Sequence, residues 1–186
     1  QLWPAWRGAE ASKSGLSPAL FVALVGLAII NRFMQDDAFI SFRYAANFVR
    51  GHGLTWNVGE APIQGYTNPV WTALMTIPMG LEWDPVRFAK AAGLVCFAVN
   101  LWLTYRLAFF LTKSATTANL TLLLLGTNYT FSAYATGGLE TQSHSMLLTW
   151  LVYLVVARES NVTWSLKRLI GISIVAAAAM LTRLDS

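Results

Sequence analysis

Two adjacent carboxylates, Asp36 and Asp37, follow directly after an apolar run that begins at Pro18. Charged groups are costly close to a bilayer, so acids at the mouth of a membrane segment indicate a functional site. One alternative is that Asp36 only caps the helix that follows, as Asp commonly does. A single cap needs one Asp, and the second then requires another explanation. We therefore predict a functional role for the pair.

A second acidic position lies next to a histidine. Glu140 and His144 are four residues apart at the start of a predicted helix, so they share one helix face. An acid and an imidazole in this arrangement could share a metal ion or a proton. The alternatives are that Glu140 stabilises the first turn of its helix and that His144 makes a polar contact within the bundle.

Arg183 lies close to a predicted helix end, and Arg43 lies on the predicted helix over residues 36–51. The guanidinium groups of Arg43 and Arg183 could each hold a phosphate through two parallel hydrogen bonds. The alternative for both is that the side chain only extends to the membrane interface, as long basic side chains do. Four aromatic residues could stack on a sugar or a lipid headgroup. The alternative is that they form an aromatic belt at the membrane interface. These residues are Trp56, Tyr66, Trp71 and Trp83.

The composition is that of an integral membrane protein. The chain has 186 residues, of which 55% are hydrophobic and 12% charged, whereas soluble domains carry about 25% charged residues. The net charge of +4 comes from scattered Lys and Arg, so nucleic-acid binding is not expected. The sequence contains no P-loop, no G-x-G-x-x-G and no C-x-x-C. We therefore expect no nucleotide or organic cofactor.

Apolar periodicity predicts an all-α polytopic membrane protein with a cytoplasmic tail over residues 1–17. The predicted transmembrane helices cover residues 18–34, 88–111, 118–135, 141–157 and 169–181. Two predicted interfacial helices in the first outer loop cover residues 36–51 and 69–81. Because the chain ends where an apolar segment gives way to charge, we expect it to be the N-terminal part of a longer protein.

The short stretch Pro69–Leu81 decides the predicted topology. It has thirteen residues, with Pro78 near its end, and a spanning helix needs about 20. If it does not span, the basic connections lie on the cytoplasmic side, as the positive-inside rule requires. Those basic residues are Arg7, Lys13, Lys113, Arg158, Lys167 and Arg168. The residues then expected together on the extracytoplasmic face are Asp36, Asp37, Glu140, Arg183 and Asp185.

The run DDAFISFRYAANFVRGHGLTWNVGEAPIQGYTNPVWT, residues 36–72, resembles a known pattern. It is similar to polytopic glycosyltransferases of the GT-C class, and most of all to the bacterial branch that includes the actinobacterial terminal arabinofuranosyltransferase of the cell wall. Members show an acid pair, then F-I-S-x-R-Y-A-x-N, G-x-G-L-x-W-N-x-G-E and E-G-Y-T-N-x-x-W-T. Shorter matches are G-L-E-T at residues 138–141 and T-R-L-D at 182–185. Gln64 and Leu184 depart from the usual Glu and Pro.

The resemblance implies a GT-C-like transmembrane helix bundle with two interfacial helices in the first extracytoplasmic loop. It implies a polyprenyl-phosphate sugar donor, such as decaprenyl-phospho-arabinofuranose, and an extracytoplasmic cell-envelope glycan as acceptor. The protein would then be a multi-pass protein of the bacterial cytoplasmic (inner) membrane, surrounded by lipid, with its active site on the extracytoplasmic face.

The resemblance also implies roles for individual residues. Asp36 or Asp37 would act as general base toward the acceptor hydroxyl. The other would hold the acceptor or a divalent cation, Mg²⁺ or Mn²⁺, that neutralises the phosphate leaving group. The residues expected to bind the donor phosphate or substrate are Arg43, Tyr66, Asn68, Glu140 and Arg183. The residues considered as ligands of that cation are Asp37, Glu140 and His144.

Three other interpretations remain open from the sequence. The first keeps the enzyme class and changes the sugar to mannose, glucose or aminoarabinose. The second is a fragment of a transporter or flippase, which would place acids near mid-membrane and often show repeated halves. The third is a structural membrane subunit whose acids only cap helices.

Overall fold

A computed structural model describes residues 15–156 and 166–184, and within these ranges the chain is helical and has no strand. The first elements are α1 (Pro18–Ile30), α2 (Ala38–Val49), α3 (Pro69–Gly80) and α4 (Pro85–Thr112). They are followed by α5 (Ala115–Thr127), α6 (Tyr129–Ala133), the 3-10 helix η1 (Tyr134–Thr136), α7 (Thr141–Val156) and α8 (Leu166–Thr182). Arg7, Lys13, Arg158 and Asp185 lie outside the described residues.

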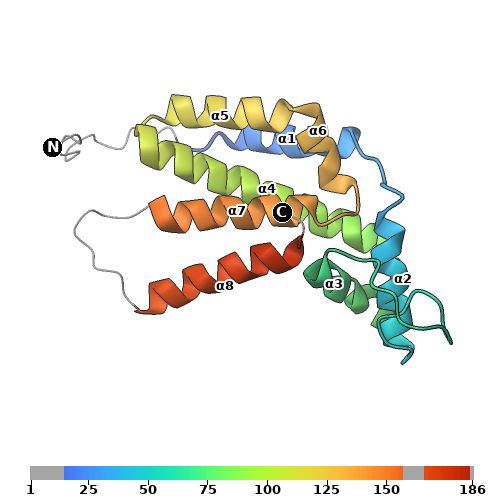
Figure 1. The fold of residues 1–186 in the computed structure, drawn as a ribbon. Helices are drawn as coiled ribbons and strands as arrows, with labels where there is room; N and C mark the ends of the chain where they lie inside the picture. The colour runs from blue at the N-terminus through green and yellow to red at the C-terminus, as the bar shows by residue number, and fades with distance from the viewer. Residues whose placement is uncertain (1–14, 157–165, 185–186) are drawn as a thin grey trace.

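The helices α1, α4, α5, α7 and α8 lie side by side and form a bundle (Figure 1). Helix α4 packs against both α5 and α7, α7 packs against α8, and α1 packs against α5 and α4. Helix α2 lies across one end of this bundle (Figure 1), and α3 packs against it and against α8. The short α6 and η1 and the beginning of α7 lie at this same end. We call it the α2 end below.

Local signals explain where several helices begin. Asp84 accepts hydrogen bonds from the backbone N–H groups of Val86 and Arg87 and so caps α4, with Pro85 in the first helical position. In the same way Ser17 caps α1, which also begins with proline. These caps are local signals, but the predicted helix over residues 88–111 did not use the one at Asp84 and began three residues late.

The predicted helix over residues 18–34 is too long by four residues. Helix α1 ends at Ile30 because the chain after it is hydrogen-bonded to the segment that follows α6. Phe33 N–H donates to Thr136 Oγ1 at 3.1 Å, and Gln35 N–H donates to the carbonyl of Gly137 at 3.0 Å. A helix continued to residue 34 would lose both bonds.

The predicted single helix over residues 118–135 is wrong. Asn128 has an extended backbone (φ −60°, ψ 116°), and its side chain accepts from Phe131 N–H at 2.9 Å, which starts the separate helix α6. Asn favours this capping role over a helix interior. The other predicted helices correspond to elements whose ends differ by three residues or fewer within the described ranges.

Separate apolar cores hold the bundle together and attach the α2 end to it. The first lies within the bundle, among α1, α4 and α5, and includes Leu24, Phe97, Leu101 and Leu122. The second lies among α2, α3 and the beginning of α4, and its buried members are Ala38, Phe42, Ala45, Trp71, Met75 and Ala89. Trp71 is only 1% exposed, so it does not belong to an interfacial belt.

Helix α4 is long and apolar enough to cross a membrane, as judged by length and composition. It is the one helix in the described ranges that meets this criterion. Helices α1 and α5 are also apolar but have 13 residues each, which at 1.5 Å per residue is about 20 Å. After α5, the chain continues through α6 and η1 toward the α2 end, so these three elements together cover a greater length than α5 alone.

Candidate functional site

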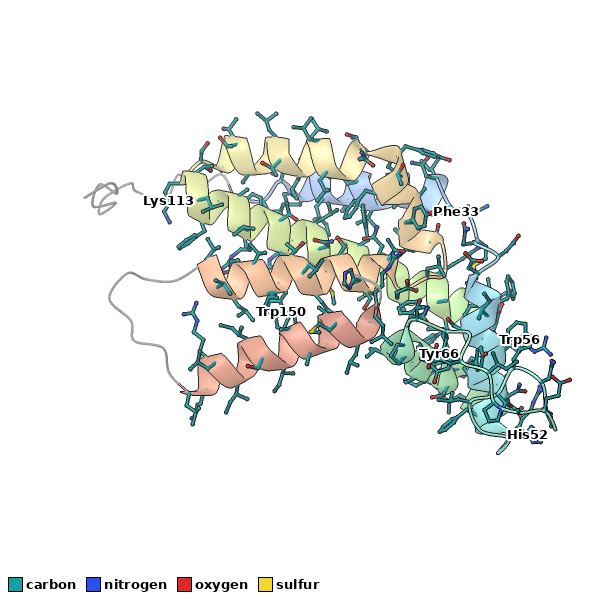
Figure 2. All side chains as sticks on the ribbon, viewed as in Figure 1. Phe33, His52, Trp56, Tyr66, Lys113 and Trp150 are labelled. Carbon is teal, nitrogen blue, oxygen red and sulfur yellow. The ribbon has the colours of Figure 1, made fainter. Side chains whose placement is uncertain are left out.

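A pocket of about 460 Å³ opens at the α2 end, between the chain before α2, the loop before α3, the start of α7 and the end of α8. Five of the predicted site residues line it: Asp37, Tyr66, Asn68, Glu140 and Arg183. Tyr66 and the neighbouring Trp56 lie far from Lys113, which marks the opposite end of the bundle (Figure 2). Residues separated by more than a hundred positions in the sequence therefore meet in one cavity.

The two predicted catalytic acids have different surroundings. Asp37 lines the pocket, whereas Asp36 does not, and both side chains are exposed. Asp37 occupies the N-cap position of α2, but its side chain makes no capping hydrogen bond. The interpretation of the pair as helix caps therefore does not explain the Asp37 carboxylate, which remains available to a ligand in the pocket.

Glu140 is held by Asn68. The Asn68 Nδ2 group donates to Glu140 Oε2 at 2.7 Å, and both side chains are 7% exposed. Asn68 Oδ1 accepts from Ser41 Oγ at 3.1 Å and from Thr72 Oγ1 at 2.9 Å. This network joins α2, the start of α3 and the start of α7, and it places a carboxylate in the wall of the pocket.

The segment before Glu140 is packed tightly against the chain that precedes α2. Gly138 has a positive φ of 81°, and a Cβ atom there would meet Met34 and Ala38. Its carbonyl accepts from the buried Trp71 Nε1 at 3.0 Å. Glycine is the residue that takes this backbone conformation without strain. The Gly138 position therefore brings Glu140 and Asp37 to the same cavity.

Arg183 reaches the pocket from the end of α8. The next residue, Leu184, donates its N–H to the carbonyl of Thr67 at 2.9 Å, which ties this end to the loop before α3. Arg183 is half-buried. The pocket thus has two carboxylates and one guanidinium in its lining, together with the hydroxyl groups of Ser41, Tyr66, Thr67, Tyr134 and Thr141.

Arg43 is not in the pocket. Its Nε donates to the carbonyl of Trp56 at 2.9 Å and its NH2 group donates to Asn57 Oδ1 at 2.7 Å. The guanidinium also lies 4.2 Å from the centroid of the Trp56 ring. Arg43 therefore fastens the outer loop to α2, and its guanidinium does not reach the pocket as a donor-phosphate ligand would.

His144 is not in the pocket either. Its Nδ1 lies 3.1 Å from the carbonyl oxygen of Ala179, so the ring contacts α8 across the bundle. Although His144 and Glu140 are one helical turn apart, their side chains have different partners. Among the described residues no group of three His, Cys, Asp or Glu side chains could hold a metal ion.

Asp37 and Glu140 are the carboxylates that a divalent cation could use in this pocket. Mg²⁺ usually keeps several waters and is bound by one or two carboxylates together with substrate phosphate. The residues present fit this kind of site, in which the substrate completes the coordination. They do not provide a closed site made of protein side chains.

Several residues of the site were missed by the sequence analysis. Ser41 is four residues after Asp37, and Thr72 is four residues after Asn68, so the helical spacing of each was a usable signal. Tyr134 also lines the pocket. It lay inside the predicted helix over 118–135, where nothing distinguished it.

A hydrogen-bonded tyrosine shapes the loop that carries Tyr66. Tyr44 is 1% exposed, and its hydroxyl donates to the carbonyl of Ile63 at 2.6 Å and accepts from Gly65 N–H at 2.9 Å. Its ring packs edge-to-face on Tyr66, with the centroids 4.8 Å apart. The loop before α3 is thereby fixed against α2.

In comparisons with known proteins, no family model, no curated protein and no solved structure matches the chain.

Proposed function

We propose that the protein is a membrane glycosyltransferase that moves a sugar from a polyprenyl-phosphate donor to a cell-envelope glycan outside the cytoplasmic membrane. Arabinofuranose is the sugar that the resemblance of residues 36–72 favours. The observation that carries the proposal is the pocket in which Asp37, Glu140 and Arg183 meet. Carboxylates suit sugar hydroxyls and proton transfer, and a guanidinium suits a phosphate.

The outer faces of the bundle support a membrane setting. Large apolar side chains on three different helices are largely exposed: Ile30 is 78% exposed, Leu124 74% and Met180 69%. Further large apolar side chains on the helices of the bundle are exposed as well, among them Val22, Val95 and Ile174. We propose that α1, α4, α5, α7 and α8 all cross the bilayer, with the pocket near the extracytoplasmic interface. A lipid-linked donor could then enter from the membrane.

In the proposed reaction, Asp37 takes the proton of the acceptor hydroxyl as general base. The acceptor oxygen forms a bond with the anomeric carbon of the sugar, and the bond from that carbon to the phosphate oxygen breaks. The bonding electrons leave with the polyprenyl phosphate. Arg183, which lines the same pocket, would stabilise the charge on that leaving group through paired hydrogen bonds.

A divalent cation would be held by Asp37 or Glu140 together with the donor phosphate. When bound, it would neutralise negative charge on the leaving group. Glu140 would offer the cation a carboxylate of fixed position, because its Oε2 is already hydrogen-bonded to Asn68.

The central test compares Asp37→Asn with Asp36→Asn in the full-length protein. Sugar transfer from polyprenyl-phosphate donors to a glycan acceptor is measured in vitro, with arabinofuranose, mannose, glucose and aminoarabinose as donor sugars. We expect Asp37→Asn to lower transfer by about 100- to 10,000-fold. Asp36→Asn is the matched control because the side chain is exposed outside the pocket. Unchanged transfer in both variants would contradict the mechanism, and preference for another donor would replace arabinofuranose.

A further inference from the structure

We propose that Asn68 is a positioning residue whose amide holds the Glu140 carboxylate in the pocket and is itself oriented by the hydroxyls of Ser41 and Thr72. The inference deepens the proposed glycosyl transfer and rests on it. It changes the role expected of Asn68, which the sequence resemblance had suggested as a substrate contact.

The orientation of the Asn68 amide follows from its partners. A carboxylate can only accept hydrogen bonds, so the group that faces Glu140 Oε2 at 2.7 Å must be the NH₂. The amide oxygen then faces the hydroxyls of Ser41 and Thr72, which both donate to it at 3.1 and 2.9 Å. The carboxylate thus excludes the flipped amide, in which an oxygen would face it, and the two hydroxyls donate to the oxygen on the other side.

The surroundings make this arrangement important for Glu140. Its side chain is 7% exposed, and a buried carboxylate without its hydrogen-bond donor is costly. Asn68 precedes the first residue of α3 and Glu140 precedes the first residue of α7. One hydrogen bond therefore sets the distance between two helix starts as well as the direction of the carboxylate.

The exchange of donor and acceptor tests the contact directly. Asn68→Asp places an acceptor opposite the Glu140 carboxylate where the 2.7 Å hydrogen bond was, so Glu140 loses its donor and two acceptors face each other. We expect the unfolding temperature of this variant in detergent to fall by several degrees.

The double variant N68D/E140Q restores a donor opposite an acceptor, and we expect it to unfold at the same temperature as the wild type. The other charged or hydroxyl-bearing groups around the pair include Asp37, Tyr66, Tyr134 and Arg183, which line the same pocket. They are present in every variant, so the wild-type unfolding temperature serves as the baseline. A double variant that was no more stable than Asn68→Asp would overturn the proposal.

Transfer activity then separates positioning from simple support of the fold. In N68D/E140Q the carboxylate has moved from position 140 to position 68, so we expect transfer to remain lower by on the order of 100-fold although stability is restored. Recovery of wild-type transfer would overturn the role of Asn68 in positioning Glu140.

If Asn68→Asp does not fold, Ser41→Ala takes its place. It removes one of the two donors to Asn68 Oδ1, and we expect several-fold slower transfer with little change in the unfolding temperature. Wild-type transfer in this variant would count against the proposal. If the wild-type protein transfers no sugar at all, the proposed function fails. The comparison of unfolding temperatures between Asn68→Asp and N68D/E140Q still decides whether Asn68 holds Glu140.

Discussion

At the scale of single residues, neighbours in the sequence have separate roles in the structure. Asp37 faces the pocket and Asp36 does not, because successive side chains on a helical turn diverge by about 100°. Arg43 and Arg183 likewise had the same two interpretations from sequence. Arg43 stacks on Trp56, whereas Arg183 lines the cavity. The contacts of each side chain therefore decide which member of such a pair is a candidate for chemistry.

The two arginines give a matched pair of substitutions. We expect Arg183→Lys to weaken the apparent affinity for a polyprenyl-phosphate donor by about ten-fold, because Lys cannot offer the planar fork of a guanidinium to a phosphate. Arg43→Lys should leave that affinity unchanged, since Arg43 is bonded to Trp56 and Asn57. Donor dependence of the transfer rate measures both. Equal losses in the two variants would argue against a phosphate at Arg183.

At the scale of elements, close backbone contacts determine where the pocket forms. Gly93 in α4 lies against η1, so close that a Cβ atom would overlap the carbonyl oxygen of Ala135. The chain then continues from η1 through Gly137 and Gly138 to Glu140. Because α4 supports η1 at this point, the position of Gly93 affects the pocket without lining it.

Gly93→Ala tests this contact. We expect it to lower the free energy of unfolding by about 1–3 kcal/mol, since the added methyl group meets backbone rather than a flexible side chain. Transfer should fall as well, because the shift of η1 moves Glu140. Thermal unfolding in detergent and the transfer assay provide the two measurements.

Gly26→Ala is the control for that experiment. Gly26 is also inside a helix, α1, but a Cβ atom there would have nothing within 4 Å. Alanine should be tolerated and should add up to about 1 kcal/mol of stability through its higher helix propensity. If Gly93→Ala behaved like Gly26→Ala, the contact with η1 would not limit the fold.

At the scale of the whole molecule, charge and helix direction give the bundle two different ends. Lys113, Lys167 and Arg168 lie at the helix ends away from the pocket, whereas Asp37 and Glu140 line it. The α2 end also carries basic residues, among them Arg87 and Lys90. In the proposed topology, the end with Lys113 faces the cytoplasm, as the positive-inside rule predicts for that connection, and the pocket faces outward. This sidedness is what the proposed use of a lipid-linked donor outside the cytoplasm requires.

Cysteine labelling in intact cells tests the sidedness. Cys96 is first replaced by Ala, and single cysteines are then placed at Glu60, in the exposed loop of the α2 end, and at Lys113, at the opposite end. We expect a membrane-impermeant thiol reagent to label position 60 in intact cells and position 113 only after permeabilisation. Labelling of both positions from outside would exclude the proposed topology.

The amino-acid sequence by itself determined most of the helices and the candidate residues. Apolar runs, Pro at helix starts and capping side chains such as Asp84 are local signals, and the loop glycines Gly51 and Gly53 mark the end of α2. The break at Asn128 also had a local signal, the preference of Asn for a helix cap, which the prediction did not use. The stop of α1 at Ile30 was harder to predict, because it depends on hydrogen bonds to Thr136 and Gly137, about a hundred residues away.

Only the tertiary structure decided which candidates belong together. Sequence spacing paired Glu140 with His144, yet Glu140 is bonded to Asn68, 72 positions earlier in the chain, and His144 contacts Ala179. The tertiary structure also placed Asp37 rather than Asp36, and Arg183 rather than Arg43, in the lining of the pocket. The physical reason is that periodicity specifies which helix face a side chain occupies, whereas its partner depends on how distant helices pack.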